Sequence, residues 1–370
     1  MDVLVFARHP GGGIRTYIYY VYSDEVFNDT SISLITPETD TMDSLLVGMK
    51  NVRSHVKCKE GMLNLLVSLC RTLFRTKPQL LHSHGFTAGL LATIPALLLR
   101  IPHIVTTHDV LREGQFPGKI GQLKRRAIGR LLSFATIINP VGKDAAENLE
   151  DNYPYLRGSP RLVSIRNGID VGWFLTDRCR DVRGEAGVEQ QDMLVGFFGR
   201  FMAQKGFATL VEAVEHWNSS EEPRLHVACF GWGGFIREEQ SELQRRGLID
   251  YFHFFPGTDD MPAALRGVDA VVIPSRWEAC PLLPMEAMVA GVPVIASRCI
   301  GLNEVVDRTP ALTFAVESVE GLLDCLRRFR DESSDFKAQA DSFRTEAAER
   351  FDVGRTARAS HELYKQLAKG

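Results

Sequence analysis

Several features that define specialised classes of protein are missing from this chain of 370 residues. Its seven cysteines are odd in number and include no C-x-x-C pair, which argues against a disulfide framework or a zinc site and favours a reducing compartment. The longest apolar run, residues 86–99, contains Pro95 and ends at Arg100, so it is too short to span a membrane. The first residues, MDVLVFA, enter a strand pattern without a basic segment, and we expect no signal peptide. These absences predict a cytoplasmic protein.

The chain also lacks a strong charge of one sign, since its formal net charge is −3. A nucleic-acid partner is therefore not expected. Hydrophobic residues make up 45% and charged residues 24%, which is the composition of an ordinary globular enzyme. The charge is uneven, because residues 1–175 contain 20 Lys and Arg against 15 Asp and Glu, and the remainder contains 23 against 31. An anionic partner thus suits the first half better than the second.

Short apolar runs bounded by turn residues alternate with longer helical patterns, and the alternation occurs twice. It predicts parallel sheets in doubly wound units. The expected strands are residues 3–7, 33–35, 80–82, 103–107, 136–139 and 162–165 in the first half, and 194–198, 225–230, 252–255, 270–273, 292–296 and 312–314 in the second. The turn signal Asn167-Gly168 and the aperiodic residues after it separate the two series.

This pattern predicts an α/β protein with two Rossmann-like domains, and the length also favours two domains over one. We place the first domain at residues 1–175 and the second at residues 176–352. The tail is amphipathic and helical with an interruption near residues 351–354. We expect its last helix, residues 353–370, to pack back on the first domain. The carboxyl ends of both sets of strands are expected to face a central cleft, because ligands bind outside those ends in such sheets.

Two carboxylates eight positions apart flank a proline-rich turn, Glu278-Ala-Cys-Pro-Leu-Leu-Pro-Met-Glu286, directly after an apolar strand. The prolines favour a loop for Glu278 and place Glu286 just inside a helix expected at residues 285–290. Free N–H groups at that helix start, with Leu282 and Leu283 as the expected donors, attract an anion such as phosphate. Two acceptors beside an anion site suit a sugar nucleotide. For these two glutamates alone, an equal alternative is that they only complement the helix dipole.

Two further loops carry residues that suit phosphate. In Gly11-Gly12-Gly13, which follows the first strand, Gly12 and Gly13 let backbone N–H groups approach a ligand closely, and a helix is expected from Ile14. The loop is not G-x-G-x-x-G, so the dinucleotide reading is weak, and a tight turn is the alternative. In GRFMAQKG, after the first strand of the second half, Arg200 and Lys205 can hold a diphosphate and stabilise it as it leaves. The alternative there is a solvated basic loop.

Histidines lie near two other strand ends. His108 follows the strand at residues 103–107 and can form a hydrogen bond with a substrate hydroxyl, although a lone histidine is more often structural. His82 and His84, in LLHSHGF, are expected on an acceptor-side loop. Their spacing resembles a metal pair, but no third ligand is identifiable.

Two glycine-containing turns complete the candidate set. Gly231, in FGWGG, and Gly257 with Thr258, in FPGTDD, can shape a base pocket or form ordinary turns. The chain contains no Asp-x-Asp triplet, the usual metal clamp for a sugar nucleotide, and Asp259-Asp260 is expected to cap a helix. We therefore expect neither a metal nor another cofactor.

Taken together, these segments resemble the retaining glycosyltransferases of the GT-B fold, in particular family 4. The matched segments are GGG at 11–13, THD at 107–109, RNGID at 166–170, GRFMAQKG at 199–206 and PSRWEACPLLPMEAMVAGVPVIAS at 274–297. Their order and spacing agree, and the last is the specific one. The chain departs from the family at Cys280, where glycine is usual, and at residues 300–304, which follow the family's GGxxE pattern only loosely.

The resemblance implies a role for each residue. Arg200 and Lys205 would bind the donor diphosphate, Glu286 the ribose hydroxyls and Glu278 the donor sugar. His108 would lie near the transferring sugar, and the glycine loop near the phosphates. The implied reaction is retaining, metal-independent transfer from a nucleotide diphosphate sugar to a carbohydrate or lipid-linked acceptor, with the acceptor on the first domain and the donor on the second. Polysaccharide or glycolipid assembly is the implied setting.

Two alternatives stay open. A nonhydrolysing sugar-nucleotide epimerase is built on the same two-domain plan, but it needs further acid and base residues that the sequence does not reveal. A non-catalytic sugar-nucleotide-binding protein could keep the fold, but it could lose Glu278 freely. Incubation with donor and acceptor separates all three.

Residues 65–77 and 124–132 of the first half both read as basic amphipathic helices. Such helices can lie on anionic lipid, which predicts peripheral contact between the basic first domain and the inner face of the membrane. The alternative is that their apolar faces pack on the sheet and their arginines are solvated.

Overall fold

The computed structural model describes residues 1–38, 40–231, 233 and 235–368. The chain divides into two compact units. Unit 1 comprises residues 1–168 and the C-terminal helix, and unit 2 comprises residues 169–352. Residues 369–370, at the end of the helix predicted at 353–370, lie outside the described residues, as do Trp232 and Gly234 of the FGWGG turn.

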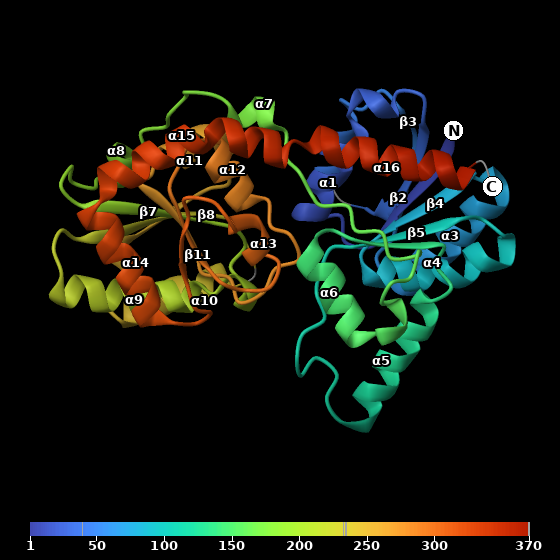
Figure 1. Ribbon diagram of the computed structural model, residues 1–370, viewed down its shortest axis with the longest axis horizontal. Helices are drawn as coiled ribbons and strands as arrows, with labels where there is room; N and C mark the ends of the chain where they lie inside the picture. The colour runs from blue at the N-terminus through green and yellow to red at the C-terminus, as the bar shows by residue number, and fades with distance from the viewer. Residues whose placement is uncertain (39, 232, 234, 369–370) are drawn as a thin grey trace. The chain divides into compact units, whose positions relative to one another are not determined.

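Unit 1 is built on a parallel six-stranded sheet in the order β3-β2-β1-β4-β5-β6 (Figure 1). Its strands are β1 (Asp2–Ala7), β2 (Ser31–Pro37), β3 (Val52–Cys58), β4 (Leu80–His84), β5 (His103–Thr107) and β6 (Ile137–Pro140). Its helices are α1 (Gly13–Tyr22), η1 (Glu25–Phe27), α2 (Asp40–Leu46), α3 (Met62–Thr76), α4 (Phe86–Leu99), α5 (Gly118–Leu132), α6 (Lys143–Asn152), η2 (Pro154–Leu156) and α16 (Val353–Ala368).

Helices cover both faces of this sheet. On one face, α1 and α16 bury Tyr17, Ile18, Ala357 and Tyr364 against strand residues such as Val5. On the other face, α3 and α4 pack against the sheet (Figure 1), as shown by a separate apolar cluster that includes Leu69 and Ala92. The last helix of the chain is therefore an integral layer of unit 1.

Unit 2 repeats the plan with a parallel sheet in the order β12-β11-β10-β7-β8-β9. Its strands are β7 (Met193–Phe198), β8 (Leu225–Phe230), β9 (Phe252–Phe255), β10 (Ala270–Ile273), β11 (Val294–Ser297) and β12 (Leu312–Phe314). Its helices are α7 (Val171–Phe174), α8 (Val182–Ala186), η3 (Ala203–Lys205), α9 (Phe207–Ser220), α10 (Ile236–Arg245), η4 (Ile249–Tyr251), α11 (Met261–Arg266), α12 (Leu283–Val289), α13 (Asn303–Val306), α14 (Val319–Asp331) and α15 (Ser333–Phe351).

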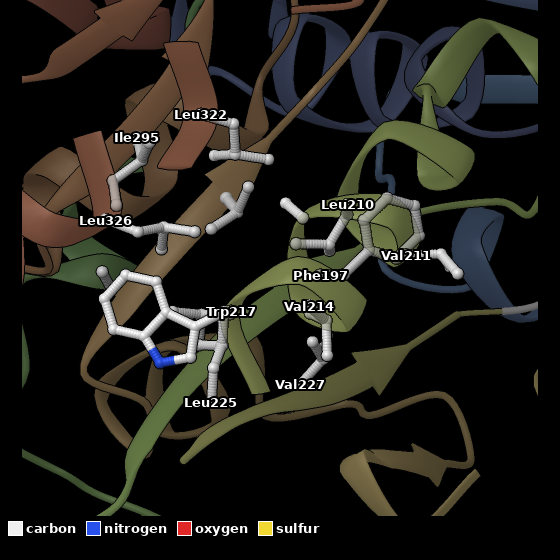
Figure 2. Close-up of a cluster of buried hydrophobic side chains, with 14 of the residues drawn as sticks. Phe197, Leu210, Val211, Val214, Trp217, Leu225, Val227, Ile295, Leu322 and Leu326 are labelled. Atoms are coloured by element: carbon white, nitrogen blue, oxygen red, sulfur yellow. The ribbon is translucent and has the colours of Figure 1, made fainter. Parts of the chain in front are cut away.

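One large cluster forms the main core of unit 2. Figure 2 shows Trp217 of α9 among side chains from β8, β11 and α14, including Leu225, Ile295 and Leu326. The indole is fully buried, and its N–H donates to the carbonyl oxygen of Pro223 at 2.8 Å, so its one polar atom is satisfied. This packing fixes α9, whose N-terminus follows the loop that carries Lys205.

Most predicted strands are confirmed, several with the predicted bounds, but in unit 1 one predicted strand is absent and one observed strand was not predicted. Residues 162–165 do not form a strand, since only Leu162 makes an isolated bridge, to Ile138. The sequence prediction also missed β3, an edge strand that is mostly exposed or half-buried and therefore lacks a continuous apolar pattern.

The predicted loop position of His82 and His84 is also wrong. Both residues lie within β4, and both are buried. In a strand, residues two apart point to the same face, and the two imidazole rings accordingly lie 4.2 Å apart between centroids. These histidines belong to the interior of unit 1 and not to a surface loop.

Candidate functional site

Each sheet has one point at which the order of its strands reverses. In unit 1 this point lies between β1 and β4, and in unit 2 between β7 and β10. Ligands of doubly wound sheets bind outside the carboxyl ends of the strands at such a point. In unit 2, the loops that follow β7 and β10 carry Lys205 and Glu278. Lys205 and Glu278 therefore lie at the edge of the sheet where a ligand site is expected.

A buried carboxylate is the centre of this group. Glu278 lies on the loop before α12, as predicted, and its Oε1 accepts hydrogen bonds from Lys205 Nζ and Ser275 Oγ, both at 2.7 Å. Gln204 Nε2 lies 3.3 Å from the other oxygen, Oε2. The charge of Glu278 is thus held by a cation and two polar donors, which is the condition under which a carboxylate can be buried.

Gly206 allows the two loops to approach one another. It has φ +64°, and a Cβ at this position would lie 1.9 Å from the carbonyl oxygen of Pro274. The backbone N–H of Arg276 donates to the carbonyl oxygen of Gln204 at 2.8 Å, which ties the same two loops together. Any side chain at Gly206 would push Lys205 away from Glu278.

Glu286 lies in the first turn of α12, which begins at Leu283, two residues before the predicted start. The Glu286 side chain is half-buried, and burial raises its pKa to about 7, although the nearby Lys205 favours the ionised form. Within the described part of the chain, no hydrogen bond is recorded for the backbone N–H groups of Leu282 and Leu283.

The other candidates of unit 2 differ in their distance from this group. Arg200 is exposed on the same β7 loop as Lys205. A Cβ on Gly231 would lie 1.8 Å from the carbonyl oxygen of Gly199, so this glycine is explained by the close packing of two loops. Gly257 and Thr258 follow β9, the edge strand.

The hydroxyl of Thr258 serves a turn rather than a pocket. It accepts from the backbone N–H of Asp260 at 3.1 Å, and Asp260 in turn caps α11 by accepting from Ala263, as predicted for this acidic pair. Nothing in this arrangement brings Thr258 to Glu278.

In unit 1, the glycine loop and His108 lie at the same edge of the sheet. Gly12 has φ +55° and precedes α1, whose N-terminus has no side-chain cap, and Gly13 is the first residue of the helix. One turn further along α1, the ring of Tyr17 lies 5.2 Å from the imidazole of His108 and 5.1 Å from that of His84. The structure therefore connects the glycine loop with His108 through α1.

A buried hydrogen-bond network holds His108 in place. Its Nε2 lies 3.0 Å from His84 Nδ1, and His84 Nε2 lies 2.8 Å from the hydroxyl of Tyr22. Tyr22 also contacts His82 Nδ1 at 2.8 Å and the hydroxyl of Tyr364 on α16 at 2.9 Å. The orientation of His108 thus depends on α1, β4 and the C-terminal helix together.

The imidazoles in this network are neutral at physiological pH. Burial lowers the pKa of His108 to about 3, and burial with neighbouring imidazoles holds the pKa of His82 and His84 well below the usual value. A neutral imidazole whose Nε2 is engaged with His84 has only Nδ1 left for a ligand. His108 is therefore suited to hydrogen bonding and not to carrying a positive charge.

The network also provides a hydrogen-bond partner for every ring nitrogen of His82 and His84, the two histidines whose spacing resembles a metal pair. His82 Nε2 lies 2.6 Å from Thr106 Oγ1, and the remaining nitrogens of His82 and His84 contact Tyr22 or His108. Among the described residues, no group of three or more His, Cys, Asp or Glu side chains is placed to hold a metal ion.

Comparison with known families identifies the family of the chain. Residues 11–173 match Glycosyltransferase Family 4, and residues 192–331 match Glycosyl transferases group 1. The chain belongs to the family 4 glycosyltransferases. Its two doubly wound units are those of the GT-B fold, as expected from the resemblance.

Individual relatives are distant. The chain is 28% identical over 243 residues to alpha-maltose-1-phosphate synthase of Mycolicibacterium smegmatis, and the match covers 61% of each protein, so the chain spans about three fifths of this relative. It is 24% identical over 300 residues to the putative teichuronic acid biosynthesis glycosyltransferase TuaC of Bacillus subtilis, covering 79% of this chain and 72% of the relative.

Solved structures show the same fold at lower identity. Anabaena Alr3699/HepE in complex with UDP-glucose superimposes with a TM-score of 0.84 at 19% identity, covering 99% of this chain and 100% of the other. Sucrose-phosphate synthase from Thermosynechococcus elongatus gives a TM-score of 0.80 at 17% identity, with 99% of both chains covered.

Sequence reasoning missed the residues that support the predicted ones. Gln204 and Ser275 contact Glu278, but the sequence motifs single out neither residue. The available signals were that Gln204 is adjacent to Lys205 and that Ser275 lies three residues before Glu278. No sequence signal pointed to Tyr22 and Tyr364, because 342 residues separate these two side chains, whose hydroxyls form a hydrogen bond.

Proposed function

We propose that this protein is a retaining, metal-independent glycosyltransferase of the hexosyltransferase type. It transfers a sugar from a nucleotide diphosphate sugar to a hydroxyl of a carbohydrate or lipid-linked acceptor, in polysaccharide or glycolipid assembly. The observation that carries the proposal is the ion pair between the half-buried Lys205 and the buried Glu278, near Glu286, where the strand order of unit 2 reverses. Membership of family 4 supports the reaction class. HepE, a structural neighbour, binds UDP-glucose.

In this proposal unit 2 binds the donor. Arg200 and Lys205 bind the diphosphate, Glu286 accepts from the ribose hydroxyls, and Glu278 accepts from hydroxyls of the donor sugar. Lys205 is shared, because it also pairs with Glu278 at 2.7 Å. Charge that develops on the leaving diphosphate draws the ammonium group more strongly than the ground-state diphosphate does, so this cation favours the transition state.

Unit 1 binds the acceptor, and His108 forms a hydrogen bond near the transferring sugar. The bond between the anomeric carbon and the diphosphate oxygen breaks while a bond forms from the acceptor oxygen to the same face of that carbon. The acceptor proton passes to an oxygen of the departing diphosphate. The site supplies cations for the leaving group, and no carboxylate is assigned as a nucleophile.

The test is incubation of the purified protein with a panel of UDP-, GDP- and ADP-sugars and candidate acceptors, with products followed by proton NMR. We expect transfer with the donor's anomeric configuration kept and with activity surviving exhaustive chelation. An inverted product, or strict dependence on added magnesium or manganese, contradicts that part of the proposal.

The same assay separates the alternatives. Epimerisation of the donor sugar without an acceptor identifies a nonhydrolysing epimerase. Donor binding without either reaction, across the acceptor panel, indicates a binding protein. Glu278→Gln serves as the matched inactive control, because it keeps the size of a side chain that the proposal places on the sugar.

A further inference from the structure

The outer surface of α3 and α4 in unit 1 is unusually apolar. The inner faces of these helices pack on the sheet through Leu65, Leu69, Leu73, Ala88, Ala92 and Ala96. This packing leaves other large apolar residues uncovered, because Leu63 is 73% exposed, Phe74 64% and Leu98 77%. Packing on the sheet therefore explains only some of the apolar residues in these helices.

The same surface is positively charged. No Asp or Glu occurs between Glu60 and Asp109, a stretch that includes all of α3 and α4. The exposed cations of this stretch are Arg71, Arg75, Lys77 and Arg100. We call Leu63, Phe74 and Leu98, together with these four cations, the α3–α4 surface.

A groove of about 540 Å³ joins the ends of the two helices, and Phe74, Lys77, Leu98, Arg100 and Ile101 are among its lining residues. Lys77 and Arg100 are the C-caps of α3 and α4, and both have the left-handed conformation, with φ 44° and 55°. Glycine is the usual residue in this conformation because a side chain there is strained. At the end of each helix, a long basic side chain in a strained backbone conformation therefore lies near an exposed apolar side chain, Lys77 near Phe74 and Arg100 near Leu98.

The neighbouring helix has the same character. Helix α5 packs against α4 (Figure 1) and carries Lys119, Lys124, Arg125, Arg126 and Arg130 with no acidic residue. Its apolar side chains Ile120 and Leu123 are exposed. The positive potential of the α3–α4 surface is therefore reinforced from the adjacent helix.

We propose that the α3–α4 surface docks on an anionic lipid bilayer, with Phe74 and Leu98 entering the interface and Lys77 and Arg100 binding lipid phosphates. Interleaved lysine, arginine and large apolar side chains without acids match a bilayer, whose apolar interior lies directly beneath its negative charge. The core of a protein interface is instead depleted of charged residues. No helix in the described part of the chain is long and apolar enough to cross a bilayer. The surface is a peripheral contact and extends the proposed function without depending on it.

Co-sedimentation with phosphatidylcholine vesicles, with and without phosphatidylglycerol, tests the proposal at low and physiological salt. No sugar nucleotide is needed, so the result stands even if the protein transfers no sugar. We expect binding only to the anionic vesicles. Each basic residue near the surface contributes about 1 kcal/mol, so Lys77→Gln with Arg100→Gln should weaken partitioning by roughly thirty-fold. Phe74→Ser with Leu98→Ser should weaken it by about tenfold or more.

Matched controls lie elsewhere on the chain. Phe235→Ser removes an exposed phenylalanine from unit 2, and Lys143→Gln removes an exposed lysine from α6. Both should bind vesicles like the wild type. Thermal unfolding of the double variants checks their folding, and Leu98→Trp gives a second measurement, since its fluorescence should be quenched by brominated lipid.

Four results would overturn the proposal. The wild type could remain in the supernatant with anionic vesicles at low salt. Both double variants could sediment like the wild type, or brominated lipid could leave Leu98→Trp unquenched. Finally, the wild type could form dimers that the double variants do not form, without vesicle binding, which would make this surface an interface between copies of the chain.

Discussion

The raised pKa of Glu286 predicts that donor binding depends on pH. Burial raises this pKa to about 7, so the side chain of the free protein is partly protonated at neutral pH. Two ribose hydroxyls that donate to one glutamate favour its ionised form, because protonation turns one of the two acceptor oxygens into a donor. Binding of the sugar nucleotide should therefore release a proton from those protein molecules in which Glu286 is protonated.

The magnitude follows from the pKa. At about pH 7, half of the free protein carries the proton, so binding releases about half a proton, and at about pH 6 it releases nearly one. Below about pH 7 the dissociation constant should approach a tenfold rise per pH unit. Titration calorimetry with UDP-glucose in two buffers of different ionisation enthalpy measures both quantities. A sugar nucleotide is preferred to a bare diphosphate, because a terminal phosphate titrates near the same pH.

Two variants make the experiment specific. Glu286→Gln should bind the donor more weakly and with no pH dependence, because the titrating group is gone. Glu278→Gln should keep the pH dependence. A wild-type dissociation constant that is equal at pH 6 and pH 8, with no buffer-dependent heat, would refute the assignment of Glu286 to the ribose.

The remaining predictions concern the other candidate residues, the tyrosine and histidine network and the stability of the protein. Arg200→Ala and Lys205→Ala should each lower turnover by about a hundredfold in initial-rate assays, since each loses one cation at the leaving group; near-normal rates in both would remove them from the site. Glu278→Gln should abolish transfer but bind bare UDP at least as tightly as the wild type, because Lys205 loses its competing partner; a loss equal to that of Glu286→Gln would show that the two acids share one role. Tyr22→Phe should lower kcat by about tenfold with KM little changed, because it releases His84 and so misplaces His108; combined with His108→Ala it should add nothing. The free energy of unfolding should fall as the pH drops below about 6.5, since burial lowers the pKa of His82, His84, His103 and His108, and these groups take up protons on unfolding. Calorimetry at pH 5 and pH 7 checks the sign.

The strands of unit 2 could be predicted closely because of how they are buried. Strands β8, β9, β10 and β12 have the predicted bounds. A parallel strand covered on both faces needs a continuous apolar run, and Ala270–Ile273 is such a run. The edge strand β3 obeys a different rule, since most of its side chains are exposed or half-buried and it carries charged residues. A continuous apolar run indicates a strand buried on both faces, so it is a poor predictor of edge strands.

The loop and helix positions of the two candidate glutamates could be predicted, but not the hydrogen bonds that they form. The prolines around Glu278 and Glu286 determine which acid is on the loop and which is in the helix, and the structure confirms both positions. That Lys205 pairs with Glu278 across 73 residues follows only from the strand order, which places β7 beside β10. The sequence predicted parallel strands without their order, so the pairing of Lys205 with Glu278 could not be anticipated.

The histidines of β4 show why polar residues mislead a prediction based on apolar runs. The predicted strand, residues 80–82, ended at His82, two residues before the end of β4 at His84. In the structure the strand continues through them, since Tyr22, Thr106 and His108 satisfy their ring nitrogens. Those partners come from other elements, and Tyr364, which completes the network, comes from the far end of the chain. A buried polar strand is stable only when its partners are present, so the position of His108 depends on the C-terminal helix.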